Sequence, residues 1–206
     1  MIIAARNKGV DRVKVFISGG CKNGKSYYAQ RLAAKQWNAL SASPLYYIAT
    51  MKPADAEDDL RIARHKTDRE GWGFITVEQP ARIEGILEKC DSGGSFLLDS
   101  LTALLANEMF PPGGGVNERA AENIERGLAC ILDVIGDIVI VSDYIYSDAI
   151  IYDPLTELFR KSLAGLDRAA AKACDAVVEV TYSAVVMHKG DRSLSGSGWR
   201  SYEKCH

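Results

Sequence analysis

The stretch GGCKNGKS at residues 19–26 limits the possible folds of this chain more than any other part of it. It satisfies the phosphate-binding pattern G-x-x-x-x-G-K-S/T, it follows a short apolar run, and it opens a helical pattern. Glycines let backbone amides curl around an anion, and the start of a helix adds its positive end. The stretch therefore predicts a strand, a phosphate-binding loop and a helix, with the loop formed by Gly19, Gly20, Cys21, Lys22, Asn23, Gly24, Lys25 and Ser26.

Two side chains of this loop and one aspartate beyond it are expected to act on the nucleotide. Lys25 can reach the outer phosphates, and Ser26 can offer its hydroxyl to Mg²⁺. A loop of this kind needs an acid at the end of a neighbouring strand to orient the metal. Asp99, after the apolar residues FLL, is our first candidate, and Asp143, after IVIVS, is the alternative. Aspartates at strand ends are also common caps and turn formers, so each has a structural interpretation as well.

Short apolar runs alternate with helical patterns along almost the whole chain. We expect strands at residues 13–18, 45–49, 74–77, 95–98, 137–142, 176–181 and 184–188. We expect helices at residues 25–37, 56–70, 82–89, 101–110, 118–135 and 154–174, the last capped by Asp153.

This alternation predicts an α/β fold of the P-loop NTPase type, with a mostly parallel sheet, helices on both faces and a C-terminal β-hairpin. The apolar fraction of 47% allows a large core. We expect one nucleotide-binding domain over residues 13–190, followed by a polar Ser/Gly-rich tail over residues 191–206.

Composition argues against several classes of partner. The formal net charge of −2 gives no reason to expect nucleic acid or an anionic membrane surface. The five cysteines are odd in number and form no Cys-x-x-Cys pair, which is typical of reduced thiols in a cytoplasmic protein. The sequence lacks an uninterrupted apolar run of about 18 residues, so we expect no membrane span.

The segment DDLRIARHKTDRE at residues 58–70 places a histidine among positive charges. In a helix, Arg61, His65 and Arg69 would recur every four residues and share one face. A neutral imidazole is nucleophilic toward phosphorus, and nearby cations favour the neutral form and can hold a triphosphate. The same spacing is also typical of a solvated helix with ion pairs, and spacing alone favours that simpler interpretation.

Five segments, taken in order, resemble the bifunctional adenosylcobinamide kinase/adenosylcobinamide-phosphate guanylyltransferase family. They are the phosphate loop, YIAT at residues 47–50, RIARHK at 61–66, T-V-E at 76–78 and LLDSLT at 97–102. The resemblance extends over about residues 13–188. The loop alone occurs in many families, but the ordered combination is much more specific.

The resemblance implies two activities in cobalamin assembly: phosphorylation of the aminopropanol hydroxyl of adenosylcobinamide, and transfer of GMP from GTP to the product through a GMP–histidine intermediate. The nucleotide-accepting histidine of the family falls on His65, which changes our interpretation of that residue from structural to catalytic. The implied site has His65, Lys25 and Asp99 as catalytic residues, Arg61 and Arg69 as nucleotide ligands beside the loop, and Ser26 and Asp99 as holders of Mg²⁺. GTP and ATP are the implied nucleotides, and a homo-oligomer, with a trimer as the first candidate, is the implied assembly.

The chain departs from the family near this site. Ser142 is followed by Asp143-Tyr144-Ile145-Tyr146, where the family usually has Asn-Glu-Val-Gly. The segment YIYSDAIIYDP at residues 144–154 replaces a shorter, glycine-bearing loop. Ahead of the T-V-E segment, Glu70 stands where the family tends to have proline and Phe74 where it tends to have tryptophan.

Two alternatives stay open at this point. The chain can be another P-loop small-molecule kinase that does not use His65, or a nucleotide-binding regulator without catalysis. The second alternative is the least favoured, because Gly24, Lys25, Ser26, Asp99 and His65 are all present.

Overall fold

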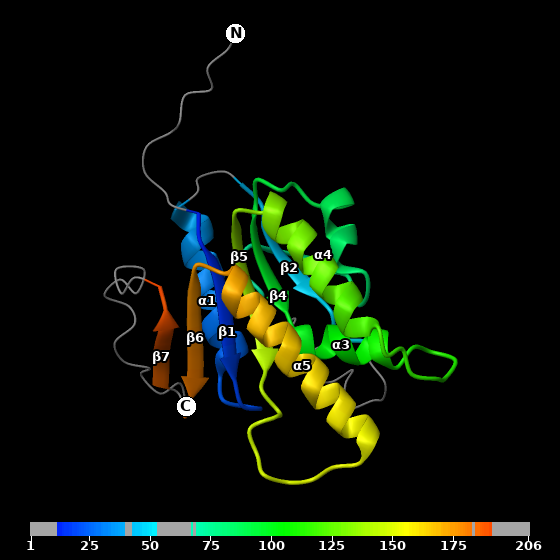
Figure 1. Ribbon diagram of the computed structural model, residues 1–206. Helices are drawn as coiled ribbons and strands as arrows, with labels where there is room; N and C mark the ends of the chain where they lie inside the picture. The colour runs from blue at the N-terminus through cyan, green and yellow to red at the C-terminus, as the bar shows by residue number, and fades with distance from the viewer. Residues whose placement is uncertain (1–11, 40–42, 53–66, 68, 183, 191–206) are drawn as a thin grey trace.

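A seven-stranded sheet forms the middle of the protein (Figure 1). The structure is a computed structural model, and it describes residues 12–39, 43–52, 67, 69–182 and 184–190. The strands follow the order β3-β2-β4-β5-β1-β6-β7, and neighbours pair in parallel except β6 and β7, which form an antiparallel hairpin. The predicted mostly parallel sheet and the C-terminal hairpin are therefore confirmed.

The elements lie close to their expected positions. The strands are β1 (Lys14–Gly19), β2 (Leu45–Ala49), β3 (Phe74–Glu78), β4 (Ser95–Asp99), β5 (Asp137–Asp143), β6 (Ala176–Thr181) and β7 (Ala184–Lys189). The helices are α1 (Lys25–Ala39), η1 (Ile83–Glu88), α3 (Leu101–Met109), α4 (Ala120–Val134) and α5 (Pro154–Ala173). Asp153 caps α5 as predicted, because its carboxylate accepts hydrogen bonds from the amides of Leu155 and Thr156.

One helical expectation needs correction, and a second needs it only at its C-terminal end. The helix expected over residues 82–89 is a 3₁₀ helix, η1. The helix expected over residues 56–70 lies mostly outside the described residues, and where the chain is described again Thr67 is helical but Arg69 and Glu70 lie in turns. The predicted tail, residues 191–206, also lies outside the described residues.

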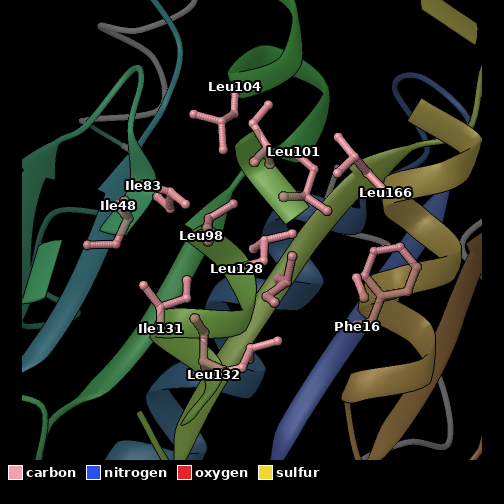
Figure 2. Close-up of a cluster of buried hydrophobic side chains, with 14 of the residues drawn as sticks. Phe16, Ile48, Ile83, Leu98, Leu101, Leu104, Leu128, Ile131, Leu132 and Leu166 are labelled. Carbon is pink, nitrogen blue, oxygen red and sulfur yellow. The ribbon is translucent and has the colours of Figure 1, made fainter. Parts of the chain in front are cut away.

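Helices cover both faces of the sheet, as the sequence predicts (Figure 1). Helix α1 packs on one face against residues such as Ile17 and Val139, both fully buried. Helices α3, α4 and α5 pack on the other face, where Figure 2 shows Leu98 beside Leu128 of α4 and Phe16 facing α5. Strands buried on both faces are apolar at nearly every position, which explains why β1, β4 and β5 read as continuous apolar runs.

None of the helices in the described part of the chain has the length and apolar character that crossing a bilayer requires.

Candidate active site

The phosphate loop joins the end of β1 at Gly19 to the start of α1 at Lys25, so the predicted strand–loop–helix unit is confirmed. A side chain at Gly19 would collide with the backbone carbonyl of Val180 on β6. The side-chain amide of Asn23 donates to the same carbonyl, and its oxygen accepts from the amide of Lys25 at 3.3 Å. Gly24 has φ of 89°, a conformation that suits glycine. Strand β6 therefore fixes the shape of the loop.

The ammonium group of Lys25 is held inside this loop. Only 5% of the residue is exposed, and Nζ donates to the carbonyl oxygen of Gly20 at 2.9 Å. Nζ also forms an ion pair with the Oδ1 atom of Asp143 at the end of β5. The position of the charge is thus set by the loop and by the neighbouring strand together, which favours its use on a bound anion.

The register of the sheet brings both candidate aspartates to the same edge. Gly19 of β1 lies opposite Asp143 of β5, and Val141 of β5 lies opposite Asp99 of β4. Ligands of open α/β sheets bind outside this carboxyl edge. The two aspartates have different partners. Asp143 forms an ion pair with Lys25, whereas Asp99 accepts a hydrogen bond from the hydroxyl of Tyr47 at 2.9 Å.

Arg69 reaches the same edge from a turn. Its guanidinium lies 3.6 Å from the centre of the Tyr47 ring, and only 7% of the residue is exposed. Burial, followed by the charge of Asp99, raises the pKa of Tyr47, so this phenol stays protonated and donates to Asp99. The structure thus brings Arg69, Tyr47 and Asp99 together. Arg61 and His65, the other two members of the predicted helical face, lie outside the described residues.

A set of hydroxyl and amide side chains ties the strand ends together, and our sequence analysis did not assign it. The Thr50 hydroxyl accepts from the amide of Ser100 at 2.7 Å and donates to its carbonyl at 2.8 Å. Asn107 donates to the Thr50 carbonyl at 2.7 Å. The Thr102 hydroxyl accepts from the amide of Asp143 at 2.9 Å. The sequence feature that could have identified this set is the position of Thr50 and Ser100, each directly after a strand.

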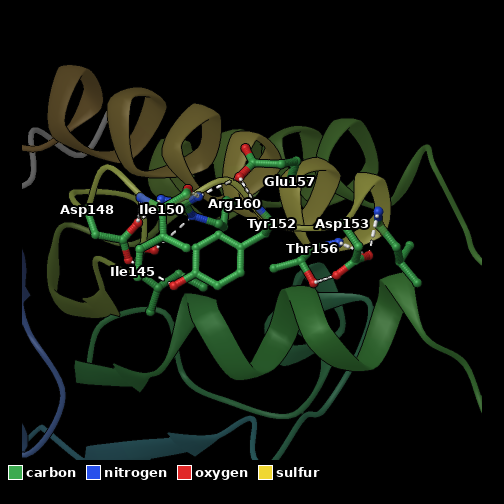
Figure 3. Close-up of polar contacts among 9 residues, drawn as sticks. Ile145, Asp148, Ile150, Tyr152, Asp153, Thr156, Glu157 and Arg160 are labelled. Atoms are coloured by element: carbon green, nitrogen blue, oxygen red, sulfur yellow. Dashed lines mark hydrogen bonds and ion pairs between the residues drawn. The ribbon is translucent and has the colours of Figure 1, made fainter.

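Arg160 holds the segment in which the chain departs from the family pattern (Figure 3). Its guanidinium donates to the carbonyl oxygens of Ile145 at 3.1 Å and Ile150 at 3.3 Å. It also pairs with Asp148 and Glu157 and lies 4.5 Å from the centre of the Tyr152 ring. Arg160 is only 6% exposed, so these contacts form a buried link that ties residues 145–152 to helix α5.

Comparison with known proteins identifies related sequences. A sequence model of the family described as cobinamide kinase / cobinamide phosphate guanyltransferase matches residues 15–189. The bifunctional adenosylcobalamin biosynthesis protein CobP of Pseudomonas aeruginosa is 33% identical over 165 residues, which cover 78% of this chain and 88% of that protein.

Solved structures with a similar fold are distant in sequence. One solved ATPase domain superposes with a TM-score of 0.52 at 10% identity, over 88% of this chain and 78% of the other. The flagellar accessory protein FlaH of Methanocaldococcus jannaschii gives a TM-score of 0.49 at 12% identity, over 90% of this chain and 82% of the other. The similarity to the ATPase domain concerns the fold alone, and it agrees with the predicted P-loop NTPase architecture.

Proposed function

The chain belongs to the cobinamide kinase / cobinamide phosphate guanyltransferase family, and from this membership we infer that it phosphorylates adenosylcobinamide and then transfers GMP from GTP to adenosylcobinamide phosphate. The observation that carries this inference is the family match over residues 15–189, which includes the whole phosphate loop. The buried ammonium of Lys25 at the carboxyl edge of the sheet supports the phosphoryl-transfer step.

In the proposed kinase step, the residues of this edge bind and orient the nucleotide. Loop amides surround its β-phosphate, and Lys25 contacts the outer phosphates. Because Lys25 already lies against Asp143 and Gly20, its position needs little rearrangement when an anion arrives. The substrate hydroxyl forms a bond to the γ-phosphorus, the bond to the nucleoside diphosphate breaks, and the hydroxyl proton leaves the oxygen. We propose that a carboxylate at this edge accepts that proton, with Asp143 as the first candidate.

The donor set at the edge fits Mg²⁺. Ser26 would offer a hydroxyl and Asp99 a carboxylate, which are the oxygen ligands that Mg²⁺ prefers. The hydrogen bond from the buried Tyr47 phenol orients the Asp99 carboxylate. When bound, the metal neutralises charge on the phosphates.

Asp99→Asn is expected to raise the Mg²⁺ concentration for half-maximal phosphorylation about 10-fold, because a carboxylate ligand is lost while its shape is kept. Asp143→Asn should change this concentration less, since the Asp143 carboxylate is engaged by Lys25. Magnesium titrations of both variants, with circular dichroism to check folding, make the comparison. A strong effect of Asp143→Asn and none of Asp99→Asn would assign the metal to the other strand end.

The proposed guanylyl transfer uses His65 as the nucleophile. A neutral imidazole nitrogen forms a bond to the α-phosphorus of GTP, and the bond to pyrophosphate breaks. A phosphate oxygen of adenosylcobinamide phosphate then attacks the same phosphorus, the P–N bond breaks, and the imidazole is regenerated. Arg61 and Arg69 are proposed to balance charge on the phosphates, as the family resemblance implies.

A kinase without guanylyl transfer is the second candidate. The observation that favours it is the replacement at residues 143–146, where Asp-Tyr-Ile-Tyr stands at the edge that holds Lys25. We also propose, from the family resemblance, that the protein forms a homo-oligomer, and from its cysteine content that it is located in the cytoplasm.

A direct assay with the full chain separates these candidates. The protein is incubated with adenosylcobinamide, Mg²⁺ and either ATP or GTP. Mass spectrometry then measures the masses of the products and of the intact protein. We expect adenosylcobinamide phosphate, its GMP-bearing product, and a protein adduct of one GMP that is lost in acid. Formation of the phosphate alone would select the kinase without guanylyl transfer. Nucleotide binding without any corrinoid product would contradict both.

A further inference from the structure

Thr50, the residue directly after β2, is tied to the end of β4 through both its backbone and its side chain. Its amide donates to the carbonyl oxygen of Asp99 at 3.3 Å. Its hydroxyl donates to the carbonyl oxygen of Ser100 at 2.8 Å and accepts from the amide of Ser100 at 2.7 Å. One residue therefore holds the backbone of Asp99 and of the residue that follows it.

These contacts begin where the pairing of β2 with β4 ends. Ala49 and Asp99 are the last paired residues of the two strands. Beyond them the hydroxyl of Thr50 takes the place of a backbone partner, because a hydroxyl both donates and accepts. Thr50 is 0% exposed and Ser100 is 8% exposed. A buried amide needs a partner, and for Ser100 the Thr50 hydroxyl supplies it.

Ser100 is fixed from a second direction by helix α3. Its hydroxyl accepts from the amide of Ala103 at 3.3 Å and so caps the start of the helix. Its carbonyl oxygen also accepts from the amide of Leu104 at 3.1 Å. The position of Asp99, which directly precedes Ser100, is therefore set by contacts from β2 and from α3 together.

Asn107 of α3 holds Thr50 in turn. Its side-chain amide donates to the carbonyl oxygen of Thr50 at 2.7 Å and to that of Pro80 at 3.0 Å. The same helix is thus capped by Ser100 at its start and bound to Thr50 two turns later. This closed set of hydrogen bonds links the ends of β2 and β4 to α3.

We propose that Thr50, held by Asn107, is a positioning residue for Asp99 and thereby sets the affinity of the site for nucleotide-bound Mg²⁺. Thr50 acts through Asp99 and does not contact the metal, since its side chain is buried against Ser100. The hydroxyl of Tyr47 orients the Asp99 carboxylate, whereas Thr50 fixes the backbone from which that carboxylate extends. The inference rests on the proposed function for the metal role of Asp99, and it makes no use of the corrinoid.

Loss of the Thr50 hydroxyl alone should weaken this arrangement. Thr50→Val keeps the branched shape of the side chain, but it leaves the buried amide of Ser100 without its partner. The backbone at Ser100 then shifts toward another partner, and Asp99 moves with it. Groups that orient a metal ligand typically change the affinity for the metal about 10-fold or more when they are removed.

The test measures how much Mg²⁺ tightens the binding of the non-hydrolysable ATP analogue AMP-PNP to the full chain. This Mg²⁺ factor is the ratio of the dissociation constants without and with Mg²⁺, both from calorimetry, so it requires no catalysis. We expect Thr50→Val and Asp99→Asn each to lower the factor about 10-fold. Thr50→Ser keeps the hydroxyl and should stay close to wild type. The double variant should match Asp99→Asn alone, because both changes act on the same metal ligand.

Thr102→Val is the matched control. The Thr102 hydroxyl accepts from the amide of Asp143 at 2.9 Å, so this variant removes the same group from the end of β5, the strand next to β4. It should lower the Mg²⁺ factor less than Thr50→Val does. Thermal unfolding of each variant checks that the protein is folded.

Several results would overturn the assignment. They are an unchanged Mg²⁺ factor in folded Thr50→Val or in Asp99→Asn, an equal loss in Thr50→Ser, and a further loss of the same size when Thr50→Val is added to Asp99→Asn. Wild type whose AMP-PNP binding does not respond to Mg²⁺ would overturn it as well. If Thr50→Val does not fold, Asn107→Leu takes its place, and an unchanged factor in that folded variant is equally decisive.

Failure of the proposed function is seen in a different measurement. If wild type does not phosphorylate adenosylcobinamide, the proposed function fails, whereas the Mg²⁺ factors of the variants still decide the role of Thr50. If wild type phosphorylates adenosylcobinamide and Thr50→Val keeps the wild-type factor, the role of Thr50 is wrong and the proposed function stands.

Discussion

Lys25→Ala should lower the rate of cobinamide phosphorylation by about 10²-fold or more, which corresponds to about 2.7 kcal/mol of transition-state stabilisation. The reason is the placement of its charge, which the loop carbonyl of Gly20 and the carboxylate of Asp143 hold at the carboxyl edge of the sheet. Removing the ammonium group leaves the outer phosphates without their fixed cation. The initial rate of phosphorylation at saturating ATP and adenosylcobinamide measures the effect.

Because Lys25 is buried, the effect of Lys25→Ala on the rate must be separated from its effect on folding stability. Lys25 is 5% exposed and neutralises Asp143, so its loss also affects folding stability. Lys25→Met keeps the packing of the aliphatic stem and removes only the charge, and thermal unfolding of both variants checks that the protein is folded. Lys35→Ala removes an exposed lysine of the same helix and should leave the rate unchanged. Near-normal turnover by folded Lys25→Met would remove Lys25 from the catalytic set.

Local sequence patterns were enough to predict the phosphate loop and the strand ends of the site. The apolar run before Gly19 and the helical pattern after Ser26 identified the phosphate loop, since strand, turn and helix signals lie within a few residues of one another. The same reasoning placed Asp99 and Asp143 at strand ends, and the structure confirms both positions. Asp153 followed by Pro154 is a typical helix start, and it correctly predicted where α5 begins.

Contacts between strands could not be predicted, because they depend on strand order. The ion pair between Lys25 and Asp143 exists because β1 lies beside β5, more than a hundred residues later in the chain. The position of Arg69 over Tyr47 was also missed, since four-residue spacing suggested a continuous exposed helix whereas the chain turns there. The hydrogen bond from the Tyr146 hydroxyl to Asp167 likewise depends on how α5 packs against the end of β5.

His65→Ala should abolish the GMP adduct and the transfer of GMP to adenosylcobinamide phosphate, while leaving phosphorylation of adenosylcobinamide within a few-fold of wild type. Guanylyl transfer through a covalent intermediate needs a nucleophile that is regenerated in each cycle, so removing it stops both halves of that reaction. Transfer of a γ-phosphoryl group goes directly to the acceptor and needs no such residue. Incubation with α-labelled GTP and Mg²⁺, followed by denaturation, measures the adduct.

The other two histidines of the chain provide the controls for this assignment. His206→Ala changes the last residue of the sequence and should label like wild type. His188 is a more informative comparison, because its Nε2 lies 2.8 Å from Glu179 in a cleft on the other side of the sheet from α1. His188→Ala should therefore retain the label. Labelling that survives in His65→Ala and disappears in His188→Ala would move the nucleophile to β7 and leave the guanylyltransferase assignment without its proposed mechanism.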